Sequence, residues 1–242
     1  MRVDVLTLFP EMFQGPMSES LIQKAREKGL LNLRVVNIRD FALDKHKTAD
    51  DTPYGGGPGM VMKADIAAKA VRSLTMEKNK RVILLCPTGE PLTQAKVNQL
   101  AGYEQLVFVC GHYEGIDDRI VPLIDEKISV GDFVLTGGEL PAMIVIDAVA
   151  RRIPGVVKET ASVEGDSFFA GRLDWPCYTK PENFEGVRVP EVLLSGHHAQ
   201  IDRWRKKAAL RSTFLRRPDL LAEVEFNNDE RALLTEIIGE PN

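Results

Sequence analysis

The segment from Ser129 to Pro141 holds the residue types best suited to binding a small molecule through the backbone. Three glycines and a proline surround the apolar run 133–135, which we predict to be a short strand, and an apolar helix follows. Glycine lets backbone amides and carbonyls approach a ligand closely, because it has no Cβ. Two similar loops, Leu85–Gly89 and Cys110–Gly115, each follow a β-like run. We therefore expect the three loops to form one pocket.

Two other motifs point to chemistry less specifically. The glycine-rich run Gly55–Gly59 matches neither G-x-G-x-x-G nor G-x-x-x-x-G-K-[ST], so dinucleotide and nucleoside triphosphate sites lose support and a plain turn is favoured. The tripeptide 165–167, Gly-Asp-Ser, resembles the start of a serine-hydrolase motif. It lies in a segment without a periodic pattern instead of on an ordered strand-to-helix turn, so hydrolysis is disfavoured.

Histidine and cysteine spacing indicates neither a metal site nor a disulfide framework. His112, His197 and His198, even together with Cys110, lack a recognised metal spacing, and structural roles are favoured. The three cysteines contain no C-x-x-C pattern, which predicts reduced and mostly buried thiols: Cys86, Cys110 and Cys177.

Charge is unevenly distributed along the chain. The formal net charge of −4 argues against a generally basic nucleic-acid-binding surface. Between Arg203 and Arg217, however, there is no acidic residue and there are seven basic ones: Arg203, Arg205, Lys206, Lys207, Arg211, Arg216 and Arg217. A solvated helix face would explain this run, but the lack of compensating acids favours a local polyanion site.

The elements that position these residues alternate between strand and helix. The chain has 242 residues, 44% of them hydrophobic and 27% charged, as expected for one large or two modest soluble domains. Helices are expected near 64–74 and 92–101, and strands at the following places: Arg2–Phe9, Leu31–Ile38, Arg81–Cys86 and Gln105–Cys110. This βαβ rhythm predicts an α/β fold with a parallel sheet, whose ligands bind beyond the carboxyl ends of the strands.

The helix between the first two strands carries recognisable end signals. Ser20 is a candidate N-cap, Gln23 could bond back to it, and Gly29 is a candidate stop. The longest apolar runs are far shorter than the ~20 residues of a membrane span. Because the first residues lack a signal-peptide pattern, we expect a cytoplasmic protein without membrane contact.

The second half of the chain changes character after a buried helix predicted at Glu139–Ile153. Residues 158–171 have no clear period, which is typical of a mobile connector, and we place a domain boundary there. Beyond them a helix is predicted, with Arg203, Lys206, Lys207 and Arg217 on one side. The opposite, apolar face is expected to contain four residues: Ile201, Trp204, Ala208 and Leu215.

Taken together, the motifs resemble those of a known family. Four of them occur in the same order as in bacterial tRNA (guanine-N1)-methyltransferases acting at tRNA position 37, the TrmD family of the SPOUT class: Tyr54–Met60, Cys110–Asp117, Ser129–Pro141, and Ser195–His198 with Trp204-Arg205. The resemblance runs from Met1 to the C-terminal helices. It implies transfer of a methyl group from S-adenosylmethionine to N1 of guanosine 37.

The resemblance also implies an architecture. It predicts a SPOUT-type parallel sheet tied in a deep trefoil knot, and a homodimer with active sites at the subunit interface. True knots are rare, so periodicity alone gives no sign of one. The implied organisation is a knotted cofactor-binding domain at 1–157, a flexible linker at 158–171, and a small, mainly helical tRNA-binding domain at 172–242.

The cofactor-binding residues follow from the matching motifs. Glu114 is implied as a partner for the positive charges of the cofactor. Cys86 stands where a serine is common and His112 where an arginine is common, so their polar contacts are expected to differ. The implied pocket residues are Leu84, Leu85, Cys86, Pro87, Gly111, Tyr113, Glu114, Gly115, Ser129, Val130, Gly131, Asp132, Phe133, Val134, Leu135, Gly137, Gly138 and Pro141.

The resemblance makes Asp166 the general base that takes the proton from guanine N1, and Arg151 the group that stabilises charge at O6. Closure of the linker is expected to dehydrate Asp166 and raise its pKa. Mg²⁺ is implied as an assistant, although no side-chain cluster forms a dedicated octahedral site. The expected RNA contacts are Ser162, His197, His198, Arg203, Lys206 and Lys207.

Two alternatives stay open. Another SPOUT enzyme, acting on ribosomal RNA or on a ribose 2′-hydroxyl, would share the pocket but need different base-facing residues. A non-catalytic RNA-binding protein could keep the fold as a scaffold, but it would be expected to lack Asp166 or Arg151, and both are present.

Overall fold

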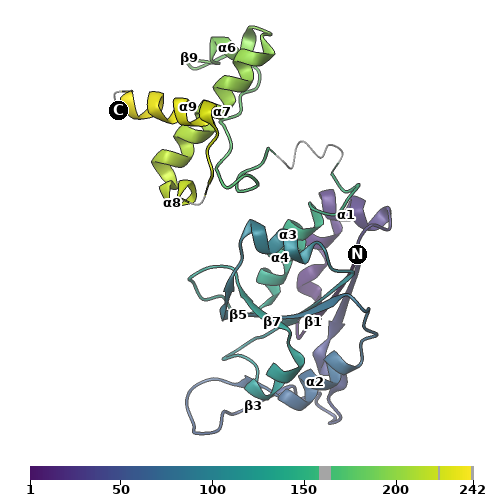
Figure 1. Cartoon of the computed structure of the whole chain (residues 1–242). Helices are drawn as coiled ribbons and strands as arrows, with labels where there is room; N and C mark the ends of the chain where they lie inside the picture. The colour runs from purple at the N-terminus through teal and green to yellow at the C-terminus, as the bar shows by residue number, and fades with distance from the viewer. Residues whose placement is uncertain (158–164, 223, 241–242) are drawn as a thin grey trace. The chain divides into compact units, whose positions relative to one another are not determined.

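The computed structural model describes residues 1–157, 165–222 and 224–240. It divides into two compact units, Met1–Lys158 and Glu159–Asn242. The first unit is mixed α/β and the second is mainly helical (Figure 1).

A five-stranded parallel sheet forms the centre of the first unit, which confirms the predicted α/β class and parallel sheet. The strand order is β2-β1-β6-β5-β7. The strands are β1 (Arg2–Thr7), β2 (Asn32–Asn37), β5 (Lys80–Pro91), β6 (Gln105–Cys110) and β7 (Glu126–Ser129).

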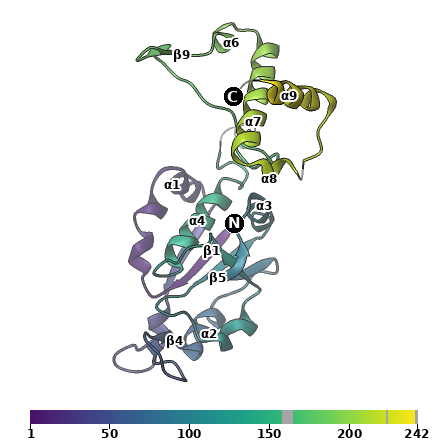
Figure 2. The same ribbon diagram turned by 90° about the vertical axis from the view of Figure 1, so that its left-hand side faces the viewer.

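Helices cover both faces of the sheet, so its central strands are apolar on both sides. On one face the helices are α1 (Ser20–Glu27), α3 (Gln94–Leu100) and α4 (Glu139–Ala150), and α2 (Ala64–Arg72) lies on the other (Figures 1 and 2). In β6, Phe108 packs with the first group while Val107 and Val109 pack with α2, as the period-2 alternation of a strand requires.

Short elements complete the described part of the first unit. A two-stranded antiparallel pair joins β3 (Asp50–Asp51) to β4 (Val61–Met62). The 3-10 helices are Pro10–Phe13, Pro16–Ser18, Ile38–Phe41 and Asp118–Leu123.

The predicted ends of α1 are partly wrong. Ser20 is the first helical residue, with φ of 55°, and Glu19 occupies the N-cap position without a side-chain hydrogen bond. Gln23 donates its side-chain amide forward to Glu27 (2.8 Å) instead of bonding back. Gly29 does end the helix: its φ is 68°, in the left-handed region that favours glycine at this position.

The apolar run 133–135 is not the predicted strand. The last strand of the five-stranded sheet, β7, ends at Ser129, and Phe133 and Val134 lie on a loop with exposed fractions of 55% and 87%. The strand prediction relied on the apolar residue types alone. Those types occur both in a buried strand and, as here, in a loop whose side chains project outward.

The second unit is built around two crossing helices. The helices are α6 (Glu191–Leu194), α7 (His198–Arg216), α8 (Pro218–Leu221) and α9 (Asn228–Gly239), and a hairpin pairs β8 (Asn183–Phe184) with β9 (Val187–Arg188). Its core contains Leu210, Leu233 and Ile237. Asn227 and Glu230 form a reciprocal capping box at the start of α9.

The predicted apolar face of α7 is partly wrong. The buried residues of α7 are Ala209, Leu210 and Thr213, whereas Leu215 is 58% exposed. The other three predicted residues, Ile201, Trp204 and Ala208, are half-buried. The reason is that α9 packs around Leu210, which joins Leu233 and Ile237 in the core, and this contact decides which residues of α7 are buried. Among the described residues, no helix is long and apolar enough to cross a membrane.

Candidate functional site

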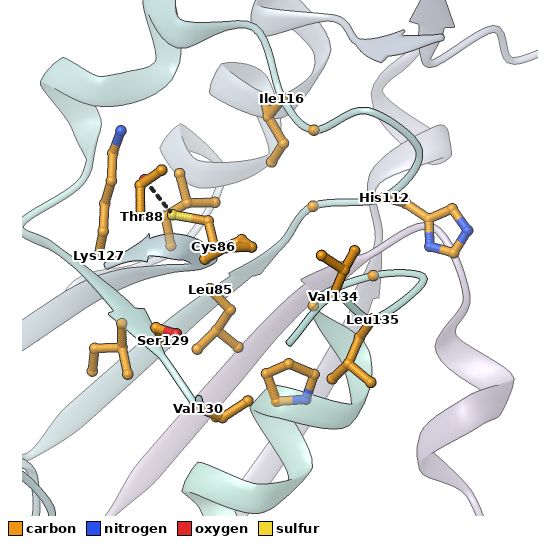
Figure 3. Close-up of a pocket in the computed structure, with 18 of the residues that line it drawn as sticks. Leu85, Cys86, Thr88, His112, Ile116, Lys127, Ser129, Val130, Val134 and Leu135 are labelled. Atoms are coloured by element: carbon orange, nitrogen blue, oxygen red, sulfur yellow. Dashed lines mark hydrogen bonds between the residues drawn. The ribbon is translucent and has the colours of Figure 1, made fainter. Parts of the chain in front are cut away.

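The three glycine-containing loops meet at one cavity of about 400 Å³, a volume typical of small-molecule sites. It lies at the carboxyl ends of β5, β6 and β7, where a parallel sheet binds its ligands. Figure 3 shows Leu85 from one of these loops, and Val130 and Leu135 from another, around the pocket. Of the residues predicted to line the pocket, all but Asp132 do so.

Several lining residues were not named individually in the prediction, although Thr88, His112 and Thr136 lie inside the predicted loops. Thr88 and His112 lie inside motifs that had been recognised, so their position was a usable signal. Asp118 and Lys127 had no such signal, because they lie in a 3-10 helix and a strand outside the glycine-containing loops. The remaining additions are Ile116, Ile120, Ile128 and Thr136.

Close backbone approaches explain why glycines occupy the pocket loops. Residues 86–89 leave the β5–β7 ladder between Leu85 and Glu90, both of which pair with Ile128. A Cβ on Gly89 would lie 2.4 Å from the Ile128 nitrogen. Such contacts cannot be relieved by rotating a side chain, so this crossing requires glycine.

A second close approach joins the other two loops. The Gly138 nitrogen donates a hydrogen bond to the Gly111 carbonyl (2.7 Å), and a Cβ on Gly138 would lie 2.8 Å from the Cys110 Cα. The neighbouring residues His112 and Gly137 form an antiparallel bridge. The Cys110–Gly115 loop and the Ser129–Pro141 loop are thus held together through their backbones.

A buried polar cluster lies next to the pocket, around Glu139. The Glu139 carboxylate is 1% exposed and accepts a hydrogen bond from Thr7 Oγ1 (2.8 Å). Its other oxygen lies 3.5 Å from His112 Nδ1. The Phe9 ring stacks on the His112 ring at 4.5 Å between centroids. Our sequence prediction missed Glu139, although a charged residue opening an apolar helix was a usable signal.

The same cluster affects the chemistry of Cys110. Burial, together with the nearby charge of Glu139, raises the pKa of the Cys110 thiol well above its usual value. The thiol is therefore protonated at neutral pH and does not act as a nucleophile. Cys86 is half-buried in the pocket wall, with Sγ 3.2 Å from Thr88 Oγ1 (Figure 3).

The Gly55–Gly59 run is more than the plain turn we predicted, because its end is bonded to a pocket loop. The Glu114 nitrogen donates to the Met60 carbonyl (3.0 Å), and the Met62 nitrogen donates to the Gly115 carbonyl (2.9 Å). Gly59 has φ of 86°, and a Cβ there would lie 2.4 Å from Glu114 Cγ. Gly59 therefore leaves room for the Glu114 side chain at the pocket wall.

The predicted catalytic residues lie in different units. Arg151 is the C-cap residue of α4, and its nitrogen donates to the Asp147 carbonyl (3.3 Å). Asp166 belongs to the first described turn of the second unit, where its carbonyl accepts a hydrogen bond from the Phe169 nitrogen (3.3 Å). Ser162, predicted to contact RNA, lies outside the described residues.

The basic run of α7 has acidic neighbours in space, although it has none in sequence. Glu236 of α9 pairs with Arg203 and with Lys207 (2.9 Å), and Glu240 pairs with Lys207 (2.7 Å) and Arg211. Hydrogen bonds to Glu240 and Glu236 raise the pKa of Lys207. Arg205 also pairs with Asp202 (3.8 Å) and Arg217 with Asp219 (2.7 Å). Five of the seven cations therefore have an acidic partner, which corrects the prediction that this run lacks compensating acids.

The remaining predicted RNA contacts are exposed. Lys206 is exposed on α7, His197 is the N-cap residue of that helix and His198 is its first residue. Among the described residues, no group of three or more His, Cys, Asp or Glu side chains could hold a metal ion.

These features define an α/β protein whose backbone loops form a small-molecule pocket at the carboxyl edge of a parallel sheet, and whose second unit is helical and rich in surface charge. The comparison with known families makes the class specific. The chain belongs to the family described as tRNA (Guanine-1)-methyltransferase TrmD, which it matches over residues 1–223.

Individual relatives agree with this assignment. The chain is 53% identical over 241 residues to the tRNA (guanine-N(1)-)-methyltransferase of Desulforamulus reducens, covering 98% of this chain and 95% of the relative. It is 50% identical over 237 residues to the enzyme of that name from Dictyoglomus turgidum, covering 98% and 96%. A third relative of that name, from Brevibacillus brevis, is 53% identical over 238 residues, covering 98% of each chain.

Proposed function

We propose that this protein transfers a methyl group from S-adenosylmethionine to N1 of guanosine 37 in tRNA, beside the anticodon. The observation that carries the proposal is the pocket formed by the three loops, in a chain that matches the tRNA (guanine-1)-methyltransferase family over residues 1–223. A tRNA substrate supports a cytoplasmic location for the proposed activity.

The pocket fits S-adenosylmethionine in size and in chemistry. A volume of about 400 Å³ suits a ligand of this size, and backbone groups at Gly111 and 130–135 are available to an adenine edge. Leu85, Val130 and Leu135 offer apolar contact, and the carboxylate of Glu114 would complement positive charge. When bound, S-adenosylmethionine supplies an activated methyl group on a sulfonium.

We also propose that the pocket loops belong to a SPOUT-type trefoil knot. Family membership supports this, and so does the strand order, because the chain must pass from β6 across β5 to reach β7. An experimental structure whose backbone could be pulled straight from its two ends would contradict the knot.

The proposed reaction needs a base and a stabilising cation. Guanine N1 carries a proton at neutral pH, so we assign its removal to the Asp166 carboxylate. Negative charge then develops at O6, and we assign its stabilisation to the Arg151 guanidinium. Assistance by Mg²⁺ stays part of the proposal without an assigned residue, and the described residues contain no group of three or more His, Cys, Asp or Glu side chains that could hold a metal ion.

We propose a homodimer in which the Asp166 of one subunit serves the pocket of the other. Four exposed apolar side chains support an interface beside the pocket: Phe133, Val134, Leu140 and Ile144. Ile144 is 47% exposed on an otherwise apolar helix, α4. We expect wild-type protein to sediment as a dimer and Ile144→Glu to shift the equilibrium toward monomer; an unchanged dimer would place the interface elsewhere.

The second unit is proposed to hold the anticodon stem-loop through Lys206, His197 and His198. Phosphate contacts of this kind give affinity but little sequence choice. Arg203 and Lys207 remain in the proposal as residues that would have to exchange Glu236 for phosphate.

The test is transfer of labelled methyl from S-adenosylmethionine to an unmodified tRNA transcript with guanosine at position 37, beside the same transcript with adenosine there. We expect label on the first transcript alone. A ribosomal RNA fragment run in parallel tests the rival SPOUT activity. Label on that fragment, or on neither tRNA while the cofactor still binds, would contradict the proposed substrate.

A further inference from the structure

The described chain around Asp166 forms a compact turn. Within residues 165–174, the Phe168 nitrogen donates to the Arg172 carbonyl (2.7 Å). Ser167 Oγ donates to Asp174 Oδ1 (2.9 Å) and accepts from the Asp174 nitrogen (3.0 Å). Asp166 therefore starts a hydrogen-bonded turn, in which the backbone has limited freedom.

Two hydrogen bonds fix this turn to the helices of the second unit. Arg172 Nη1 donates to Glu230 Oε1 on α9 (2.6 Å), and the Leu173 nitrogen donates to Thr213 Oγ1 on α7 (3.0 Å). Thr213 is fully buried and Glu230 is 7% exposed, so both acceptors are held by their surroundings. The helices that receive the turn also pack against each other (Figure 1).

Glu230 is itself fixed at the start of α9. Its Oε2 accepts from the Asn227 nitrogen (3.1 Å), while its own nitrogen donates to Asn227 Oδ1 (2.9 Å). Burial opposes ionisation, but the bonds from Arg172 and Asn227 outweigh it and keep the pKa of Glu230 below its usual value. The carboxylate that receives Arg172 is therefore ionised at neutral pH and held by the capping box.

We propose that Arg172 and Glu230 are positioning residues for methyl transfer, because they fix the turn that carries Asp166. The inference rests on the proposed role of Asp166 as the base. A base displaced by about 1 Å can cost roughly 100-fold in rate, so a contact that orients the turn affects the reaction without touching the substrate. Neither residue lies in the first unit, so the cofactor pocket does not depend on them.

The experiment compares Arg172→Met and Glu230→Gln with wild-type protein. Glu230→Gln keeps an oxygen for the Asn227 nitrogen, so the helix cap is largely retained. We expect the single-turnover rate to fall roughly 10- to 100-fold in each. Affinities for S-adenosylmethionine and for tRNA should stay within about twofold of wild type. The pocket residues and the proposed tRNA contacts Lys206, His197 and His198 are unchanged in these variants. Rates within about twofold of wild type would overturn the inference.

The matched control is Arg231→Met. Arg231 lies at the same end of α9 but donates to the Phe226 carbonyl (3.1 Å), which is outside the turn. Its rate should match wild type. Arg172→Lys keeps the positive charge and should recover most of the rate lost in Arg172→Met. An equal loss in Arg231→Met, or no recovery in Arg172→Lys, would indicate a general structural effect and overturn the positioning role.

A double variant separates this inference from the proposed function. If Arg172 acts through Asp166, adding Arg172→Met to Asp166→Asn should lower the rate no further, and a full additional loss would overturn the inference. If Asp166→Asn alone kept the wild-type rate, the base assignment would fail and this inference with it. If Asp166→Asn lost the rate while Arg172→Met kept it, the positioning role alone would fail.

Discussion

The two units use different means to hold their functional groups. In the first unit, the pocket is shaped by backbone, with Gly89 and Gly138 at crossings too close for any side chain. In the second unit, ion pairs and helix caps hold the functional groups, as in the contacts of Arg172 with Glu230 and of Lys207 with Glu240. A pocket formed by close backbone contacts tolerates few substitutions, whereas a side chain in an ion pair can exchange one charged partner for another. We therefore expect cofactor binding to depend on packing and RNA-dependent chemistry to depend on charge.

The largest effect on the pocket is expected from Gly138→Ala. Its Cβ would lie 2.8 Å from the Cys110 Cα, a backbone atom that cannot rotate away. The two pocket loops must then separate, and we expect affinity for S-adenosylmethionine to fall by more than about 100-fold, measured by calorimetry. Gly15→Ala is the control, because a Cβ on Gly15 meets nothing within 4 Å. Equal affinities in the two variants would contradict the backbone account of the pocket.

Glu139→Ala should lower the free energy of unfolding of the protein by about 2–3 kcal/mol, because it removes a buried partner of Thr7 and leaves a cavity. Urea unfolding measures the change. Glu139→Gln keeps an oxygen for Thr7 and should lose less. Equal losses in both variants would mean that the hydrogen bond to Thr7 does not stabilise the fold.

Acid should loosen the turn that carries Asp166. The folded pKa of Glu230 is lowered, so its ionised form stabilises the second unit above the unfolded pKa near 4.3, and this contribution is lost as pH falls through the folded pKa. We expect wild-type stability to fall more steeply below about pH 4.5 than that of Glu230→Gln. Identical pH profiles from chemical unfolding would show that the Arg172 contact does not contribute.

The smallest effects are expected on the RNA side. Lys206→Met should weaken tRNA binding about threefold and reduce the salt slope by about 1, as for loss of one phosphate contact. Lys207→Met should have less effect, because its ammonium already pairs with Glu236 and Glu240. Filter binding at several salt concentrations measures both. A larger loss in Lys207→Met would mean that these ion pairs open for RNA.

Much of the first unit could be predicted because its signals are local. Apolar runs ending in glycine located β6 and the loop after it, and the motifs gave nearly the whole pocket lining. The strand predicted around Val134 was wrong, because a strand and an exposed apolar loop contain the same residue types. The partners of Lys207 and Arg172 could not be predicted, since they depend on where α9 packs. Residues distant in sequence but adjacent in space leave no periodic signal.

We infer that the first unit binds the cofactor while Asp166, held by the second unit, performs the proton transfer. The most direct test measures cofactor binding and single-turnover methyl transfer on the Asp166→Asn protein. We expect binding of S-adenosylmethionine to be unchanged and the rate to fall roughly 100- to 10,000-fold, as for loss of a general base. A wild-type rate, or a loss of cofactor binding equal to the loss in rate, would contradict this division.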